Sequence, residues 1–151
     1  MNSKAWLALM VAAAASPGCG LSTTNQQDRQ IVSVPLQATH VNAGKIAQAT
    51  LVAEGKATGI TFVIGGVPDG VTRPVHLYTF IYPGTCSQLG AEATYAMNRI
   101  VLAERIGRYG GWRLSKSLPV GLEPLRSGGY SIVVRTSPAD GNLDIFCGEI
   151  P

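Results

Sequence analysis

The segment Gly129–Ile150, GYSIVVRTSPADGNLDIFCGEI, holds the pattern that decides the fold. In Gly129–Thr136, Tyr130, Ile132 and Val134 occupy alternate positions, which is typical of a β-strand with one buried and one solvated face. Ser137–Gly141 (SPADG) contains residues that favour tight turns, and Asn142–Ile150 is a second strand candidate. The segment therefore predicts two strands joined by a tight reversal.

Turn signals recur throughout the chain from residue 31 onward. Their spacing, about eight to twelve residues, is typical of an all-β sandwich or barrel. The strand candidates are Ile31–Val41, Lys45–Glu54, Ala57–Gly65, Pro74–Tyr82, Trp112–Leu118, Gly129–Thr136 and Asn142–Ile150. The intervening turns include Tyr82–Thr85 (YPGT). We expect residues 31–151 to form one all-β domain of about seven to eight antiparallel strands.

Gly90–Ile106 (GAEATYAMNRIVLAERI) departs from this pattern. Its apolar residues recur at helical spacing, at Ala93, Ala96, Met97 and Ile100. The segment is either a short helix or an irregular crossover that carries one more strand.

The N-terminal region is typical of an exported protein. Ala5–Ala15 (AWLALMVAAAA) is shorter than the roughly 20 apolar residues that a membrane-spanning helix needs, so residues 1–18 are interpreted as a signal peptide. The small residues before Cys19 resemble a bacterial lipoprotein cleavage site, in which the cysteine is lipidated. We expect residues 19–30 to be a lipid-anchored tether. Alternatively, an ordinary signal peptidase cuts near Ala13–Ala15, and the protein is secreted or periplasmic with Cys19 as a free thiol.

Cysteine parity favours lipidation, because the chain has three cysteines and an odd cysteine in a secreted protein needs an explanation. Acylation of Cys19 would leave Cys86 and Cys147 as a pair. The predicted location is thus the bacterial cell envelope, with the domain anchored to the membrane and facing the periplasm.

Charge and composition exclude several classes of function. The net charge is +3, and the only concentration of basic residues is Arg99, Arg105, Arg108 and Arg113, with Glu104 among them. A nucleic-acid surface needs denser clustering, so we expect no nucleic-acid partner. No Ser-His-acid spacing indicates a nucleophile with its base. Pairs of acidic residues such as Asp140 and Asp144 are interpreted as solvated turn charges.

Several segments together resemble the copper,zinc superoxide dismutases. They are Gly44–Glu54, Gly59–Ile64, Gly65–Gly70, Arg73–Cys86 (RPVHLYTFIYPGTC), Tyr130–Arg135 (YSIVVR) and Asn142–Ile150. The resemblance covers most of residues 31–151 and implies a Greek-key β-sandwich or barrel. It also implies a disulfide between Cys86 and Cys147. The chordin-type domain, another small sandwich, has a similar closing segment.

The metal ligands of that family are mostly missing here. Its His-x-His motif appears as His76-Leu77-Tyr78, and Arg135 stands where a histidine would follow the paired valines. Ser87–Arg113 contains no histidine. A firmly held copper ion needs three or four nitrogen or sulfur donors, so we predict no catalytic, cofactor-binding or metal-binding residues. Arg135 is expected to pair with a carboxylate such as Glu149 or to receive an anionic partner.

Two interpretations of function follow from these residues. The first is a non-catalytic envelope lipoprotein whose sandwich is a binding or structural module, with an unidentified protein partner. Tyr78, Phe80, Tyr82, Tyr95, Tyr109 and Trp112 are candidates for its binding face, although Phe80 and Trp112 are also suited to a small core. The alternative is a protein that handles copper or zinc, or keeps a residual dismutase-type redox activity, through His40, His76 and Met97.

Overall fold

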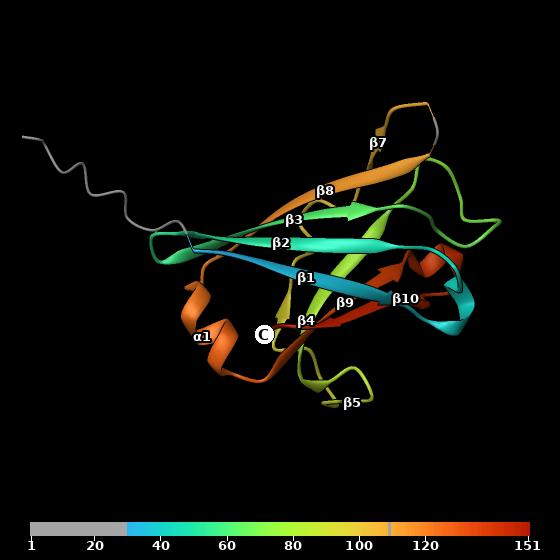
Figure 1. Cartoon of the computed structure of the whole chain (residues 1–151). Coiled ribbons are helices and arrows are strands. Elements are labelled where there is room, and N and C mark those ends of the chain that lie inside the picture. The colour runs from blue at the N-terminus through green and yellow to red at the C-terminus, as the bar shows by residue number, and fades with distance from the viewer. Residues whose placement is uncertain (1–29, 109) are drawn as a thin grey trace, which may run out of the picture.

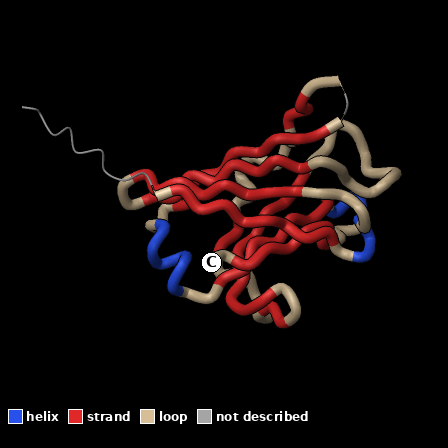
Figure 2. Tube along the Cα trace, in the orientation of Figure 1, coloured by secondary structure: helices blue, strands red, loops and turns tan. Residues whose placement is uncertain are grey.

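The structure is a computed structural model that describes residues 30–108 and 110–151. These residues form antiparallel strands in two layers, with one short α-helix at the side (Figures 1 and 2). The prediction of an all-β sandwich is confirmed. The predicted signal peptide, Cys19 and the rest of the tether up to residue 29 lie outside the described residues. No helix in the described part is long and apolar enough to span a membrane.

The two layers belong to one continuous ladder of strands. The first layer contains β1 (Ile31–Ala38), β2 (Ala47–Glu54), β3 (Ala57–Ile64), β8 (Gly111–Leu118) and β7 (Glu104–Ile106). The second contains β10 (Asp144–Glu149), β9 (Tyr130–Thr136) and β4 (Leu77–Thr85), with the short strands β5 (Gln88–Leu89) and β6 (Tyr95–Ala96) paired to β4. The helical elements are α1 (Leu122–Ser127) and the 3-10 turns His40–Asn42 and Pro138–Asp140.

Strand β1 joins the layers. Its residues Ile31–Leu36 pair with β2, whereas Gln37 and Ala38 pair with β10. Several strands that are neighbours in space are distant in sequence. For example, β3 pairs with β8, and β4 pairs with β9. This is a Greek-key connectivity. It places β4, β9 and β10 side by side, and these three strands carry the candidate site.

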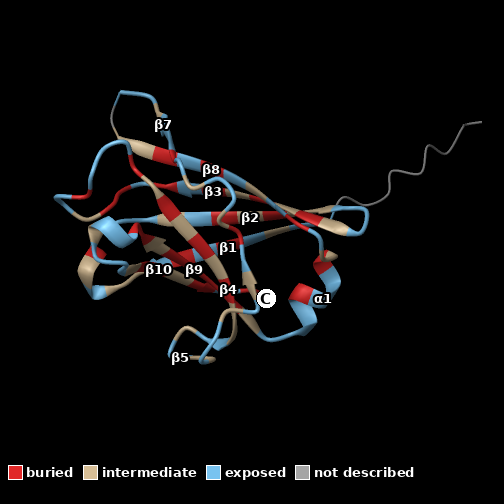
Figure 3. Ribbon diagram, turned by 180° about the vertical axis from the view of Figure 1, so that it is seen from behind, coloured by how far each residue is buried: buried red, intermediate tan, exposed pale blue. Residues whose placement is uncertain are grey.

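A single apolar core fills the space between the layers (Figure 3). In β3, Ile60, Phe62 and Ile64 point inward and are almost completely buried, while the residues between them are more exposed. Ile132 and Val134 of β9 face them from the other layer. Burying a side chain of this size contributes about 1.5–3 kcal/mol to stability. The inward apolar side chains of the alternating strands therefore hold the two layers together.

The seven predicted strands are all present, with ends shifted by up to three residues. Gly90–Ile106 is not a helix. It is a crossover that carries β6 and β7, which agrees with the second of the two interpretations. The Met97 N–H donates to the Thr79 carbonyl oxygen, and the Ala103 N–H donates to that of Val75. Backbone N–H groups that would bond within a helix therefore bond instead to β4 and to the residues directly before it.

The predicted turn at Tyr82–Thr85 is wrong, because β4 continues through it to Thr85. Pro83 does not interrupt the pairing with β9. The Pro83 carbonyl accepts from the Gly90 N–H, whereas the next residue, Gly84, donates to Gly129 beside β9. Since consecutive residues of a strand point their backbone groups to opposite sides, the missing N–H of Pro83 lies on the side away from β9.

Candidate functional site

The candidate site is the outer face of β4, β9 and β10. Leu77, Thr79 and Ile81 of β4 are buried in the core, so the alternate residues Tyr78, Phe80 and Tyr82 face outward. The strand register places Arg135 opposite Tyr78 on one side and opposite Asp144 on the other. Four of these residues, Phe80, Tyr82, Arg135 and Asp144, form a group that we call the arginine cluster.

Arg135 has a contact on each side in this cluster. Its guanidinium carbon lies 4.8 Å from the centre of the Phe80 ring. Its Nη2 donates to the Tyr82 hydroxyl at 3.3 Å, and its Nε donates to Asp144 Oδ1. The side chain is 19% exposed, against 38% for Asp144. The hydrogen bond to Asp144 is the main cause of the raised pKa of Arg135, and the hydrogen bond to Tyr82 raises it further. The face therefore holds a fixed cation, and two of its five N–H donors are hydrogen-bonded to Asp144 and Tyr82.

Arg135 pairs with a carboxylate, as expected, but this carboxylate is Asp144 and not Glu149. Glu149 lies opposite Ser131, farther along the β9–β10 ladder. Its Oε1 accepts a hydrogen bond from the Cys86 N–H at 3.1 Å. Asp144 is the partner because it is the residue directly across the ladder from Arg135. The expectation that Asp144 is only a solvated turn charge is wrong for the same reason.

Asp140 is also not a simple solvated charge. Its Oδ1 accepts from the Thr72 N–H and hydroxyl, both at 2.8 Å, and the Ser137 hydroxyl lies 2.6 Å from its Oδ2. The hydrogen bond from Ser137 is the main reason that the pKa of Asp140 lies below its usual range, and the hydrogen bonds from Thr72 lower it further. The carboxylate thus ties the β9–β10 turn to the loop that precedes β4.

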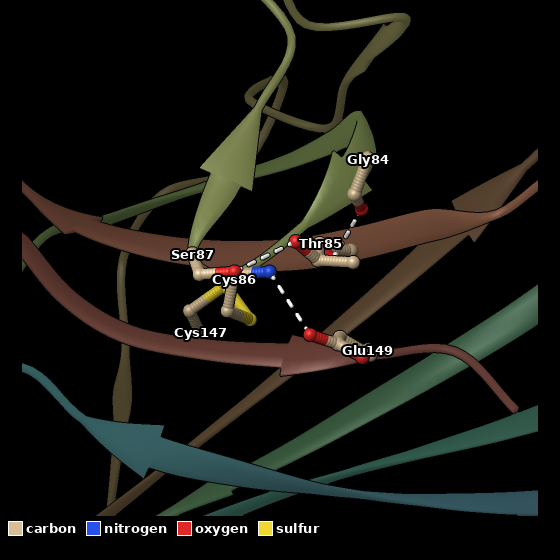
Figure 4. Close-up of a disulfide and its surroundings, with 7 residues drawn as sticks. Gly84, Thr85, Cys86, Ser87, Cys147 and Glu149 are labelled. Atoms are coloured by element: carbon tan, nitrogen blue, oxygen red, sulfur yellow. Dashed lines mark hydrogen bonds between the residues drawn. A yellow bond between two sulfur atoms is a disulfide. The ribbon is translucent and has the colours of Figure 1, made fainter.

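The disulfide between Cys86 and Cys147 is present, which confirms the prediction (Figure 4). The Cα atoms are 5.8 Å apart, and the cysteines are separated by 61 residues in the sequence. Cys147 lies on β10 opposite Val133 of β9, and Val133 is also the partner of Phe80. Val133 is completely buried although the core lies on the other side of the sheet. The disulfide and Phe80 thus flank a covered apolar residue on the outer face.

The residues of the metal-handling alternative are not arranged as a ligand set. His76 is half-buried and pairs with Leu102 in an isolated bridge. Met97 is in the core, whereas His76 lies between the buried Val75 and Leu77 and so faces outward. His40 is exposed, as expected, in the turn after β1. Within residues 30–108 and 110–151, no group of three or more His, Cys, Asp or Glu could hold a metal ion.

The aromatic candidates lie in different environments. Tyr78 and Tyr82 lie on the outer face beside Phe80, and the Phe80 and Tyr82 rings are 6.1 Å apart. Trp112 is in the core, under the guanidinium of Arg73 at 4.9 Å, as expected for a core residue. Tyr95 packs against the core edge, 6.1 Å from Tyr130. Tyr109 lies outside the described residues.

The sequence places Arg135 two residues before the predicted turn Ser137–Gly141 and Asp144 three residues after it, so the two lie close in the hairpin. A regular register would nevertheless place Leu143 opposite Arg135, and the turn alone therefore does not indicate Asp144 as the partner. Comparisons with protein-family models, curated proteins and solved structures gave no match for this chain.

Proposed function

We propose that this protein is a non-catalytic bacterial envelope lipoprotein whose sandwich, similar to that of the copper,zinc superoxide dismutases, is a binding or structural module. The observation that carries the proposal is the position of Arg135. It stands where the resemblance requires a metal-ligand histidine, and it is held there by Phe80, Tyr82 and Asp144.

The charge of Arg135 opposes a metal ion on this face. Two positive charges a few ångströms apart repel, and the repulsion is larger where protein shields the charges from water. The other positions of the motif supply one imidazole, at His76, and a phenol, at Tyr78. Such a set falls short of the three or four donors that hold copper firmly.

A metal-loading experiment tests the loss of catalysis. Full-length protein is incubated with excess copper and zinc, desalted, and measured for bound metal and for superoxide dismutation. We expect far less than one metal ion per chain and no activity above buffer. Stoichiometric copper that is lost in His76→Ala would instead support the metal-handling alternative.

A second experiment tests the envelope location. Cys19→Ser is expected to block lipidation, so that the protein moves from the membrane fraction to the soluble fraction or accumulates unprocessed. Two or more acyl chains are needed for stable anchoring. A mature protein that starts near Ser16 and carries no lipid would contradict this part of the proposal and favour secretion.

A further inference from the structure

The first layer has a free strand edge next to an apolar groove. Strand β7 pairs with β8 only at Gly111–Arg113, so the rest of β8 has no neighbouring strand on that side among the described residues. A groove of about 570 Å³ lies between this part of β8 and the crossover. Its lining residues include Arg99 and Ile100 of the crossover and Ser115, Lys116, Ser117 and Leu118 of β8.

The backbone groups that face the groove can be assigned from the ladder. The Gly65 N–H donates to the Ile46 carbonyl, which directs the odd-numbered residues of β3 toward β2. The backbone groups of the even-numbered residues of β3 therefore hydrogen-bond to β8. One of these pairs is Ile60 of β3 with Lys116 of β8. By alternation, Ser115 and Ser117 direct their N–H and C=O groups to the free edge. A strand edge of this kind is a template for pairing with another extended chain.

Lys116 gives this edge its specificity. Its side chain lies on the inward face of β8, the same face as the buried Leu114 and Leu118. Its Nζ donates to the Ile100 carbonyl across the groove. Burial lowers the pKa of Lys116. An inward charge at an edge disfavours pairing with an apolar strand, because the ammonium would be buried without a counter-ion.

The charges and apolar groups of the groove define the partner that removes this penalty. Arg99 and Lys116 both line it, and none of the carboxylates in residues 30–108 and 110–151 does. Ile100 of the crossover also lines it and is 68% exposed. A chain paired to Ser115 and Ser117 would place one side chain directly across from Lys116, where opposite charges are favourable. The residues two positions before and after it would face the apolar groove.

We propose that the free edge of β8 binds an extended acidic segment of another protein by strand addition, with the pattern apolar-x-acidic-x-apolar and the acidic side chain against Lys116. Strand addition of this type takes its affinity from main-chain hydrogen bonds and its specificity from alternate side chains. The proposal deepens the binding role proposed above and rests on it. A second copy of this chain fits poorly, because pairing β8 with β8 about Lys116 opposes like charges.

The test uses full-length protein in mild detergent and the capped heptapeptide Thr-Val-Thr-Glu-Thr-Val-Thr. Titration is followed by amide chemical shifts and by fluorescence anisotropy of a labelled peptide. We expect saturable shifts at Ser115 and Ser117. Lys116→Gln is expected to weaken binding at least about tenfold, as for loss of a charge-assisted hydrogen bond. Lys45→Gln, an exposed lysine before β2, is the matched control and should leave binding unchanged.

Two further arms keep the result independent of any effect of substitution on folding. A peptide with N-methylated amides on its pairing side should not bind, and Lys116→Glu should restore binding to a peptide in which lysine replaces glutamate. Equal binding by Lys116→Gln, unchanged Ser115 and Ser117 amides at millimolar peptide, or a concentration-dependent dimer through β8 would overturn the proposal. None of these readouts depends on metal content, so their failure is distinct from failure of the non-catalytic role.

Discussion

Removal of the disulfide is the perturbation whose magnitude follows most directly from the structure. The double variant Cys86→Ser, Cys147→Ser opens a loop in which the two cysteines are 61 residues apart. In the chain-entropy model, a cross-link over such a loop stabilises the folded state by about 4 kcal/mol. A domain of this size has a total stability of about 5–15 kcal/mol, so the loss is a large fraction of it.

The substitutions leave the nearby backbone contact in place. The hydrogen bond from residue 86 to Glu149 uses the main-chain N–H, which serine retains. The difference between the proteins therefore reports mainly on the cross-link. With a urea m-value of about 2 kcal/mol/M, the unfolding midpoint should fall by about 2 M. The m-value itself should rise, because an unfolded chain without the cross-link exposes more surface.

Urea unfolding followed by tryptophan fluorescence and circular dichroism measures this difference. Wild-type protein reduced with a phosphine should unfold at the same urea concentration as the double variant. Ser87→Ala is the matched control, since its hydroxyl contacts only the neighbouring Thr85 hydroxyl at 3.0 Å. A double variant within about 1 kcal/mol of the oxidised protein would refute the reasoning, because the loop would then restrict the unfolded chain far less than the model requires.

Three further predictions concern single positions. Arg135→Ala should lower stability by about 1 kcal/mol, the sum of a contact with the Phe80 ring and a partly exposed ion pair; a loss above 3 kcal/mol in urea unfolding would contradict this. Asp140→Asn should remove stability that the wild type has above the ordinary carboxyl pKa and loses as pH falls through the lower pKa of the folded state, so the two proteins should converge in acid thermal melts. Gly84→Ala should cost more than Gly44→Ala, because a Cβ at residue 84 would lie 2.3 Å from a backbone oxygen while one at residue 44 meets nothing within 4 Å; equal melting temperatures would show that the backbone shifts to make room.

The long strands could be predicted because each alternates between a buried and a solvated face. Ala57–Gly65 has this pattern clearly, and the structure moves its end by one residue. Gly129–Thr136 alternates in the sequence and its start moves by one residue, but the predicted solvated face is wrong, because Ser131 and Val133 on that face are also buried. The short elements could not be predicted from periodicity. β5 and β6 have two residues each, and α1 has only six with Pro124 inside it.

The Gly90–Ile106 segment shows how tertiary contacts outweigh local spacing. Its apolar residues have helical periodicity, yet Met97 and Ala103 hydrogen-bond to the approach and edge of β4. Of the candidate site, the cysteine pair was predicted through the family resemblance. The partner of Arg135 was not, because it depends on the strand register, which a β-bulge between Asp144 and Phe146 shifts.

The double pairing of β1 has a consequence for the order in which the protein folds. The first layer needs only residues up to β8, but the end of β1 also pairs with the last strand. Directly after β1, the Thr39 hydroxyl donates to the Asp144 carbonyl across 105 residues of sequence. During synthesis, which runs from the N-terminus, β1 can pair with β2 early. Gln37 and Ala38 of β1 then have no strand partner until β10 has been synthesised. Contacts this distant in sequence slow folding, and an open strand edge is exposed meanwhile. Conditions that delay the arrival of β10 should therefore favour misassembly of the second layer before the first.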